Sequence, residues 1–177
     1  AVPAFFLAQL ASREVKVVLT GDCADELFGG YEKYLAGYYT QLYNKLPAFL
    51  RSTIATLANK IPFNKYTNVW QRKIKKVIDN ASRTSFDLHY HLMCLGFQDA
   101  ERKELLKPEL YRDTKKQVEE IYYSAPGKSS LDKSSYTDVH ILLEGDMLAK
   151  VDRICMRHSL ESRVPFLDTD LVETAFR

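Results

Sequence analysis

The sequence has few of the residues that mark specialised classes of protein. Its three cysteines, Cys23, Cys94 and Cys155, are too scattered for a disulfide framework or a zinc cluster. Seven glycines and six prolines in 177 residues leave no collagen-like or low-complexity segment. A net charge of +2 is too small to indicate a nucleic-acid partner. No apolar run is long enough to span a bilayer, and we expect a cytoplasmic protein without membrane contact.

What is present is the composition of an ordinary globular protein, with 46% hydrophobic and 27% charged residues. The length suits one domain or a piece of a larger one. The chain starts with Ala1 instead of methionine, which we interpret as the start of an excised fragment.

Only one segment has the pattern of a β-strand. The β-branched run 15–19 predicts it, after a helix expected over residues 3–13. A turn at 20–22 follows, and then a short helix that Gly29-Gly30 interrupts. This helix–strand–turn–helix order is the unit from which α/β sheets are built.

The remainder is predicted to be helical, giving about eight helices in all against one clear strand. Residues 128–134 are expected to form a loop, Glu144-Gly145 a break, and Asp146 the N-cap of the next helix. A lone strand forms no sheet, so its partner strands are expected upstream of this chain. The other expected helices cover residues 31–59 with Pro47 as a break, 85–95, 99–106, 110–124, 136–143 and 147–158.

A basic stretch over residues 60–76 surrounds Trp70. Such a stretch is compatible with a nucleic-acid patch, but a solvated helix face explains it more simply. His89 and His91 are two residues apart and would not share a helix face, so no histidine metal site is predicted.

The first group of candidate site residues lies in T-G-D-C-A-D-E-L-F-G-G-Y, directly after the strand. Ligands of open α/β sheets bind at the carboxyl ends of strands. Asp22, Asp25 and Glu26 would share one face of a helix, and Mg²⁺ is the natural cation to offset their charge. Helix capping and the helix dipole explain the same carboxylates equally well.

The second group lies in D-M-L-A-K-V-D-R, which starts at Asp146. Lys150 and Arg153 recur at helical spacing and flank Asp152. They are candidates for binding anionic groups, and a solvated face with intrahelical ion pairs is the alternative.

Together, T-G-D-C-A-D-E-L-F-G-G-Y and the downstream K-V-D-R-x-x-M-x-H-S-L-E-S-R-V-P-F-L-D resemble the asparagine synthase family. Within it they look like the synthetase domain of the bacterial glutamine-hydrolysing enzymes. The resemblance implies that ATP adenylates aspartate and that ammonia attacks the acyl-adenylate. The products are asparagine, AMP and pyrophosphate, and the cofactors are ATP and Mg²⁺.

The resemblance also implies an α/β fold of the adenine-nucleotide hydrolase-like (PP-loop ATPase) type, represented here mostly by its helical C-terminal part. The family's pyrophosphate loop, Ser-Gly-Gly-x-Asp-Ser, is absent from this sequence, and so is the nucleophilic cysteine that begins its glutaminase domain. Residues 1–177 are therefore expected to be a partial synthetase domain that is inactive alone. A homodimer of the full-length protein is compatible with this interpretation.

The family's roles transfer to five residues of the first motif. Thr20 and Gly21 match the pair whose backbone lies against ATP, and Asp22 matches the residue needed to form the acyl-adenylate. Asp25 matches an aspartate on the magnesium and pyrophosphate side. Glu26 fits either a supporting role or contact with the substrate amine.

The catalytic cation of one family branch aligns with Arg153, and Lys150 lies one helical turn away. Either cation could stabilise the leaving pyrophosphate, and both remain candidates. Cys23 stands where the family usually has glycine. If that position needs a positive φ, cysteine costs on the order of 1 kcal/mol there.

Two other functions remain open. A related amidotransferase would act on a different carboxylate, such as a sugar precursor or a peptide. A helical interaction module would have no chemistry, and the acidic cluster after the strand is evidence against it.

Overall fold

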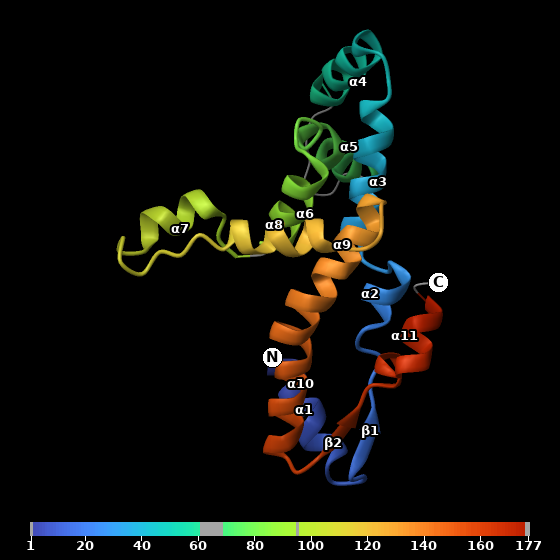
Figure 1. Ribbon diagram of the computed structural model, residues 1–177, viewed down its shortest axis with the longest axis vertical. Coiled ribbons are helices and arrows are strands. Elements are labelled where there is room, and N and C mark those ends of the chain that lie inside the picture. The colour runs from blue at the N-terminus through green and yellow to red at the C-terminus, as the bar shows by residue number, and fades with distance from the viewer. Residues whose placement is uncertain (1, 61–68, 95, 176–177) are drawn as a thin grey trace.

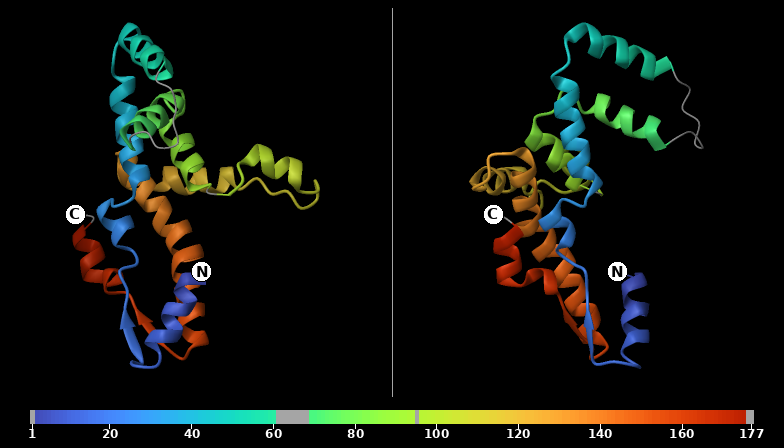
Figure 2. Two further views of the ribbon diagram at one scale, coloured as in Figure 1. Left: turned by 180° about the vertical axis from the view of Figure 1, so that it is seen from behind. Right: turned by 90° about the vertical axis from the view of Figure 1, so that its right-hand side faces the viewer.

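The computed structural model describes residues 2–60, 69–94 and 96–175 of the chain (Figure 1). A long helical rod formed by α9 (Ser130–Asp138), η1 (Val139–Leu148) and α10 (Ala149–Arg157) runs along much of the molecule. The strands lie at one end of the rod, and α4 and α5 lie at the opposite end of the molecule. Helix α7 projects to one side, as the views in Figure 2 also show.

The predicted helix–strand–turn–helix unit at the start of the chain is confirmed. It consists of α1 (Val2–Ala11), β1 (Val17–Leu19) and α2 (Ala24–Phe28). Helix α2 ends at Gly29, whose φ of 69° glycine adopts with the least strain. The glycine pair thus ends the helix, as its position predicted.

The prediction of one strand is wrong, because β2 (Glu161–Arg163) pairs in parallel with β1. In this register Val18 lies opposite Ser162. The backbone hydrogen bond from Thr20 N to Arg163 O, 2.9 Å long, continues the pairing beyond the strand. Glu-Ser-Arg has no β-branched residue, so only the neighbouring strand makes this segment extended.

Within the described residues the helices outnumber the predicted eight, running from α1 to α11. Helix α6 begins where Thr84 Oγ1 accepts a 3.0 Å hydrogen bond from Asp87 N. Helix α8 starts at Lys115, later than expected. The remaining elements are α3 (Glu32–Asn44), α4 (Ala48–Lys60), α5 (Val69–Asp79), α6 (Ser85–Met93), α7 (Asp99–Leu105), α8 (Lys115–Ser124), the 3-10 turn η2 (Pro165–Leu167) and α11 (Thr169–Ala175).

Of the loop expected at 128–134, residues 128 and 129 lie outside a helix, but residues 130–134 form the start of α9. Ser129 Oγ accepts from Asp132 N at 3.0 Å, while Asp132 Oδ2 accepts from Ser129 N at 3.1 Å. This reciprocal capping box satisfies two backbone donors that a helix start otherwise leaves unpaired. Serine and aspartate therefore start a helix here instead of a loop.

The break expected at Glu144-Gly145 is also absent, and Asp146 is not an N-cap. Both lie inside the π-helical segment η1, which leads into α10 without interruption. One helical glycine costs only about 1 kcal/mol relative to alanine. Burial of Leu143, 2% exposed, stabilises the same segment.

The basic stretch 60–76 divides between described and undescribed residues. Residues 61–68 lie outside the described part of the chain. In α5, residues 73–76 are exposed, and Lys73 Nζ lies 3.1 Å from Glu32 Oε1 of α3. This part of the stretch agrees with a solvated helix face.

Two small hydrophobic clusters hold these elements together. Phe86, Tyr90, Val118 and Tyr122 join α6 to α8, and Ala8, Cys155 and Leu160 join α1 to α10. The periodic residues Phe6, Leu7 and Leu10 of α1 are each more than 60% exposed. The periodicity thus predicted the helix correctly, but its apolar face points outward. No helix among the described residues is both long and apolar enough to cross a membrane.

Candidate functional site

The turn after β1 is tight and left-handed. Cys23 is the residue before α2, with φ 74° and ψ −14°, and its side chain is 3% exposed. The prediction that a cysteine here would be strained if φ is positive therefore applies. Burial raises the pKa of Cys23 to about 11, and the negative charges of Glu26 and Asp22 add to this effect.

The three carboxylates of the turn do not share one helix face. Asp22 precedes the helix, and it is Cys23, not Asp22, that occupies the N-cap position. Asp25 is exposed, whereas Glu26 is 1% exposed and faces the protein interior. Among the described residues, no group of three His, Cys, Asp or Glu side chains is arranged to hold a metal ion.

Asp25 is held over the second glycine of the motif. A Cβ atom placed on Gly30 would lie 2.0 Å from Asp25 Oδ1, and Gly30 N donates a 3.0 Å hydrogen bond to Asp25 O. Any side chain at residue 30 would therefore displace this carboxylate. Gly29 is needed for its φ and Gly30 for the space that it leaves.

Thr20 directly follows β1 and has a buried hydroxyl. Its Oγ1 atom has no hydrogen-bond partner among the described residues. Buried hydroxyl groups are usually paired, so this atom lies where a further group would satisfy it.

Glu26 is held by contacts from two other elements. Tyr31 Oη donates to Glu26 Oε1 at 2.7 Å, and Ser135 Oγ of α9 donates to the backbone oxygen of Glu26 at 2.5 Å. Burial raises the pKa of Tyr31 well above its ordinary value, and its hydrogen bond to Glu26 acts in the same direction. The phenol therefore remains protonated and can donate to the carboxylate.

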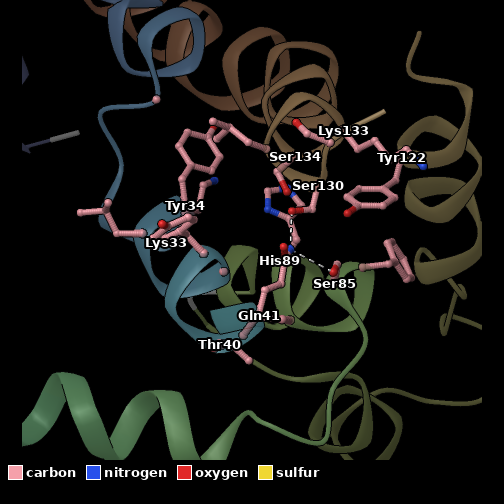
Figure 3. Close-up of a pocket in the computed structure, with 18 of the residues that line it drawn as sticks. Lys33, Tyr34, Thr40, Gln41, Ser85, His89, Tyr122, Ser130, Lys133 and Ser134 are labelled. Carbon is pink, nitrogen blue, oxygen red and sulfur yellow. Dashed lines mark hydrogen bonds between the residues drawn. The ribbon is translucent and has the colours of Figure 1, made fainter. Parts of the chain in front are cut away.

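A second buried polar centre surrounds Asp138, which the sequence did not single out. Its partners Lys33, Tyr34 and His89 are labelled in Figure 3. Its side chain is 0% exposed, with Lys33 Nζ 2.7 Å from Oδ2. Tyr34 Oη donates to the same oxygen at 2.5 Å. His89 Nε2 lies 3.3 Å from Oδ1, the other oxygen of the same carboxylate. These partners come from α3 and α6, so the centre joins three helices.

The charge of Asp138 is stabilised by these neighbours. Burial acts to raise the pKa of this carboxyl, but His89 and the Lys33 ammonium act more strongly, so the pKa is lowered overall. Burial and the charge of Asp138 raise the pKa of Tyr34 far above its ordinary value. Asp138 is therefore ionised, and Tyr34 remains a donor.

Lys33 connects the two buried centres. Its Nζ atom lies 4.8 Å from the ring centre of Tyr31 and 5.6 Å from that of Tyr34. A cation at this distance from an aromatic face is attracted to it. Glu26, Tyr31, Lys33 and Asp138 thus form a continuous path of contacts from the turn after β1 to the rod.

The predicted cations Lys150 and Arg153 both lie on α10. Lys150 Nζ is 3.6 Å from Asp146 Oδ2, an i, i+4 ion pair. Arg153 is exposed and has no side-chain hydrogen bond or ion pair with the described residues. Burial raises the pKa of Cys155 on the same helix, and Asp152 and then Asp22 add to that effect. The turn after β1 therefore lies within electrostatic range of α10.

Comparison with known sequences identifies the family. The sequence model described as Asparagine synthase matches residues 1–177. The chain belongs to the asparagine synthase family. The resemblance carried by the two motifs is thereby confirmed across the whole chain, including the helical middle.

The relatives within the asparagine synthase family are longer proteins. The chain is 32% identical over 180 residues to asparagine synthetase (glutamine-hydrolyzing) 1 of Bacillus subtilis (strain 168), covering 99% of this chain and 27% of the relative. It is 34% identical to a putative asparagine synthetase (glutamine-hydrolyzing) of Mycobacterium tuberculosis (strain ATCC 25618 / H37Rv), covering 99% and 26%.

A more distant family member comes from Methanocaldococcus jannaschii. Its putative asparagine synthetase (glutamine-hydrolyzing) 2 is 28% identical over 157 residues, which cover 87% of this chain and 28% of that protein. The chain spans about a quarter of the length of these relatives. No solved structure matches the chain.

Proposed function

We propose that this chain is part of an ATP-dependent amide-forming ligase that makes asparagine from aspartate, ATP and ammonia through a β-aspartyl-adenylate. Glutamine would supply the ammonia through a glutaminase domain. The observation that carries the proposal is the family match over residues 1–177, joined with the acidic turn at the carboxyl end of β1. The relatives are named as glutamine-hydrolysing asparagine synthetases, and this supports the choice of aspartate as substrate.

The chain would form the later part of the synthetase domain, in a fold of the PP-loop ATPase type. A sheet of two three-residue strands is too small to be stable alone. The apolar residues Val17 and Leu19 of β1 are 43% and 72% exposed, as further sheet and helix layers would require. The upstream pyrophosphate loop would complete the nucleotide site. The three unpaired cysteines agree with a cytoplasmic setting.

Thr20 and Gly21 would lie against ATP, and Asp22 would act in forming the acyl-adenylate. The buried, unpaired Thr20 hydroxyl supports a ligand or a further segment at this position. Gly21 has no heavy atom within 4 Å of the place where a Cβ would stand, so its backbone is open to close approach.

Asp25 fits the proposed magnesium ligand. Mg²⁺ in nucleotide sites is held by one or two carboxylates together with phosphate oxygens and water, and Asp25 is an exposed carboxylate beside Gly30. The ion would neutralise phosphate charge when bound. Of the two roles open to Glu26, its 1% exposure supports the supporting one, because it anchors α2 through Tyr31.

The positive charge toward the leaving pyrophosphate would come from α10. Arg153 is exposed and without a described partner, which leaves its guanidinium available to an anion. Lys150 remains the alternative, although its pairing with Asp146 would have to be exchanged for the substrate.

The test is aspartate-dependent release of pyrophosphate by the full-length protein, supplied with ATP, Mg²⁺ and ammonia. We expect release with aspartate and none from residues 1–177 alone, since that chain lacks the pyrophosphate loop. Asp22→Asn should lower adenylate formation at least about tenfold, or 1.4 kcal/mol, at unchanged melting temperature. Release with another carboxylate instead of aspartate would indicate a related amidotransferase, and none with any substrate would refute a ligase.

A further inference from the structure

A cavity of about 930 Å³ lies among α3, α6, α8 and the start of α9, and Phe28 and Gly29 at the end of α2 also line it (Figure 3). Cavities of roughly 300–1,000 Å³ are typical of sites for small molecules. Every charged side chain among the described residues that line it is basic: Lys33, Arg83, Lys128 and Lys133. Lys33 is already paired with Asp138, so three of these cations remain to attract an anion.

Two helix starts meet at the wall of this cavity. Helices α6 and α9 begin at Ser85 and Ser130, and both serines line it. Gln41 Nε2 reaches both hydroxyl oxygens, at 3.4 Å from Ser85 Oγ and 2.5 Å from Ser130 Oγ, so the two starts lie side by side. Helix N-termini carry partial positive charge, which favours anions; the caps of these two helices already use the Asp87 and Asp132 N–H groups.

An unpaired buried hydroxyl lines the same cavity. Thr40 is 3% exposed, and its Oγ1 has no hydrogen-bond partner among the described residues. A buried polar atom without a partner costs free energy that a bound group would recover. This observation is independent of the charges and of the helix starts, and it too indicates a polar ligand.

Aromatic side chains form another part of the lining. Phe86 and Tyr122, with ring centres 5.4 Å apart, are buried residues of this lining, and Tyr123 beside them is 57% exposed. Lys133 Nζ lies 5.3 Å from the ring centre of Tyr123 and 6.0 Å from that of Tyr122. This places a cation beside aromatic rings, an arrangement suited to a ligand that has both a negative group and a flat ring.

We propose that this cavity is a second ligand site, which binds a small anionic molecule with an aromatic ring, of mononucleotide size. The anion is held by Lys128, Lys133 and the starts of α6 and α9, and the ring packs against the exposed Tyr123. Ser134 lines the cavity, and the adjacent Ser135 binds the Glu26 backbone. Occupancy is thereby connected to the turn after β1 through a single helix.

The test is calorimetric titration of the full-length protein with GMP, in saturating ATP so that the proposed catalytic nucleotide site is filled. We expect saturable binding of GMP and at least tenfold weaker binding of guanosine, which lacks the anion, and of ribose 5-phosphate, which lacks the aromatic ring. Lys133→Gln should weaken GMP binding about tenfold, the loss of roughly one charge-assisted contact. Lys107→Gln, an exposed lysine outside the cavity, should have no effect.

Thr40→Val provides a second test of the cavity, one that changes no charge. Because the hydroxyl has no described partner, its removal should leave the melting temperature unchanged or raised, yet weaken GMP binding severalfold. A fall in melting temperature with unchanged binding would assign Thr40 to the fold and overturn its role as a ligand contact.

Asp22→Asn separates this site from the proposed catalytic one, and GMP binding should survive it. No saturable GMP binding, or equal affinity in Lys133→Gln and Lys107→Gln, would overturn the proposal. Loss of GMP binding in Asp22→Asn alone would assign the nucleotide to the turn after β1, refuting the second site while leaving the proposed ligase function standing.

Discussion

The ammonium group of Lys33 lies 2.7 Å from the carboxylate of Asp138, in a position where Asp138 has no contact with solvent. The pair joins α3 to α9, and Tyr34 adds a hydrogen bond to the same oxygen. Burial of two charges is stable only when each has its partner. We therefore expect substitutions of Asp138 to lower the stability of the fold strongly.

Replacing Asp138 by Asn should destabilise the full-length protein by about 3–5 kcal/mol, because Lys33, whose side chain is only 13% exposed, would lose its counter-charge. The matched control is Asp146→Asn, which removes an exposed i, i+4 partner of Lys150 and should cost less than about 0.5 kcal/mol. Denaturant unfolding measures both. Equal, small effects in the two variants would show that the buried pair contributes nothing.

Acid should remove the contribution of Asp138. Because its pKa in the folded protein is below the ordinary value of 3.8, the carboxylate stabilises the fold above that pH, and the contribution is lost as pH falls through the native pKa. The difference in unfolding free energy between wild type and Asp138→Asn should be constant between about pH 5 and 7 and shrink below about pH 4. Unfolding curves measured across this range would contradict the assignment if the difference grew in acid.

Cys23 should carry backbone strain that glycine relieves. Comparing Cys23→Gly with Cys23→Ala removes the sulfur in both variants and leaves the left-handed φ of 74° as the main difference. We expect the glycine variant to be more stable than the alanine variant by about 1 kcal/mol, although glycine is usually the less stabilising residue. Thermal unfolding decides the order, and an alanine variant of equal or greater stability would rule out strain.

Arg153→Gln or Lys150→Gln should slow the chemistry of the full-length enzyme without changing its melting temperature. A fixed cation at the leaving group stabilises mainly the transition state, and its removal costs about 3–4 kcal/mol of activation free energy. We expect the larger effect at Arg153. Arg157→Gln, an exposed arginine at the last turn of α10, is the control. Rates within about twofold of wild type in both single variants and in the double variant would show that Lys150 and Arg153 only form a solvated face of α10.

The local sequence determined the features that depend on neighbours along the chain. The β-branched run around Val17 predicted β1, and the glycine pair predicted the end of α2. The helical segments from residue 85 to 106 were also predicted with nearly correct bounds. Two separated motifs were enough to identify the family. Each of these signals comes from residues a few positions apart, where backbone preference and capping operate.

Tertiary structure alone decided which groups are buried together. Strand β2 has no strand-forming composition and exists because β1 lies beside it. The Glu26 carboxylate lies inward, where Tyr31 donates a hydrogen bond to it and Ser135 donates to the backbone oxygen of the same residue, which separates it from Asp25. Asp138 can be buried as a charge only because Lys33, Tyr34 and His89 converge on it from two other helices. Contacts between residues that are distant in sequence leave no local sequence pattern. These buried groups could therefore be identified only from the tertiary structure.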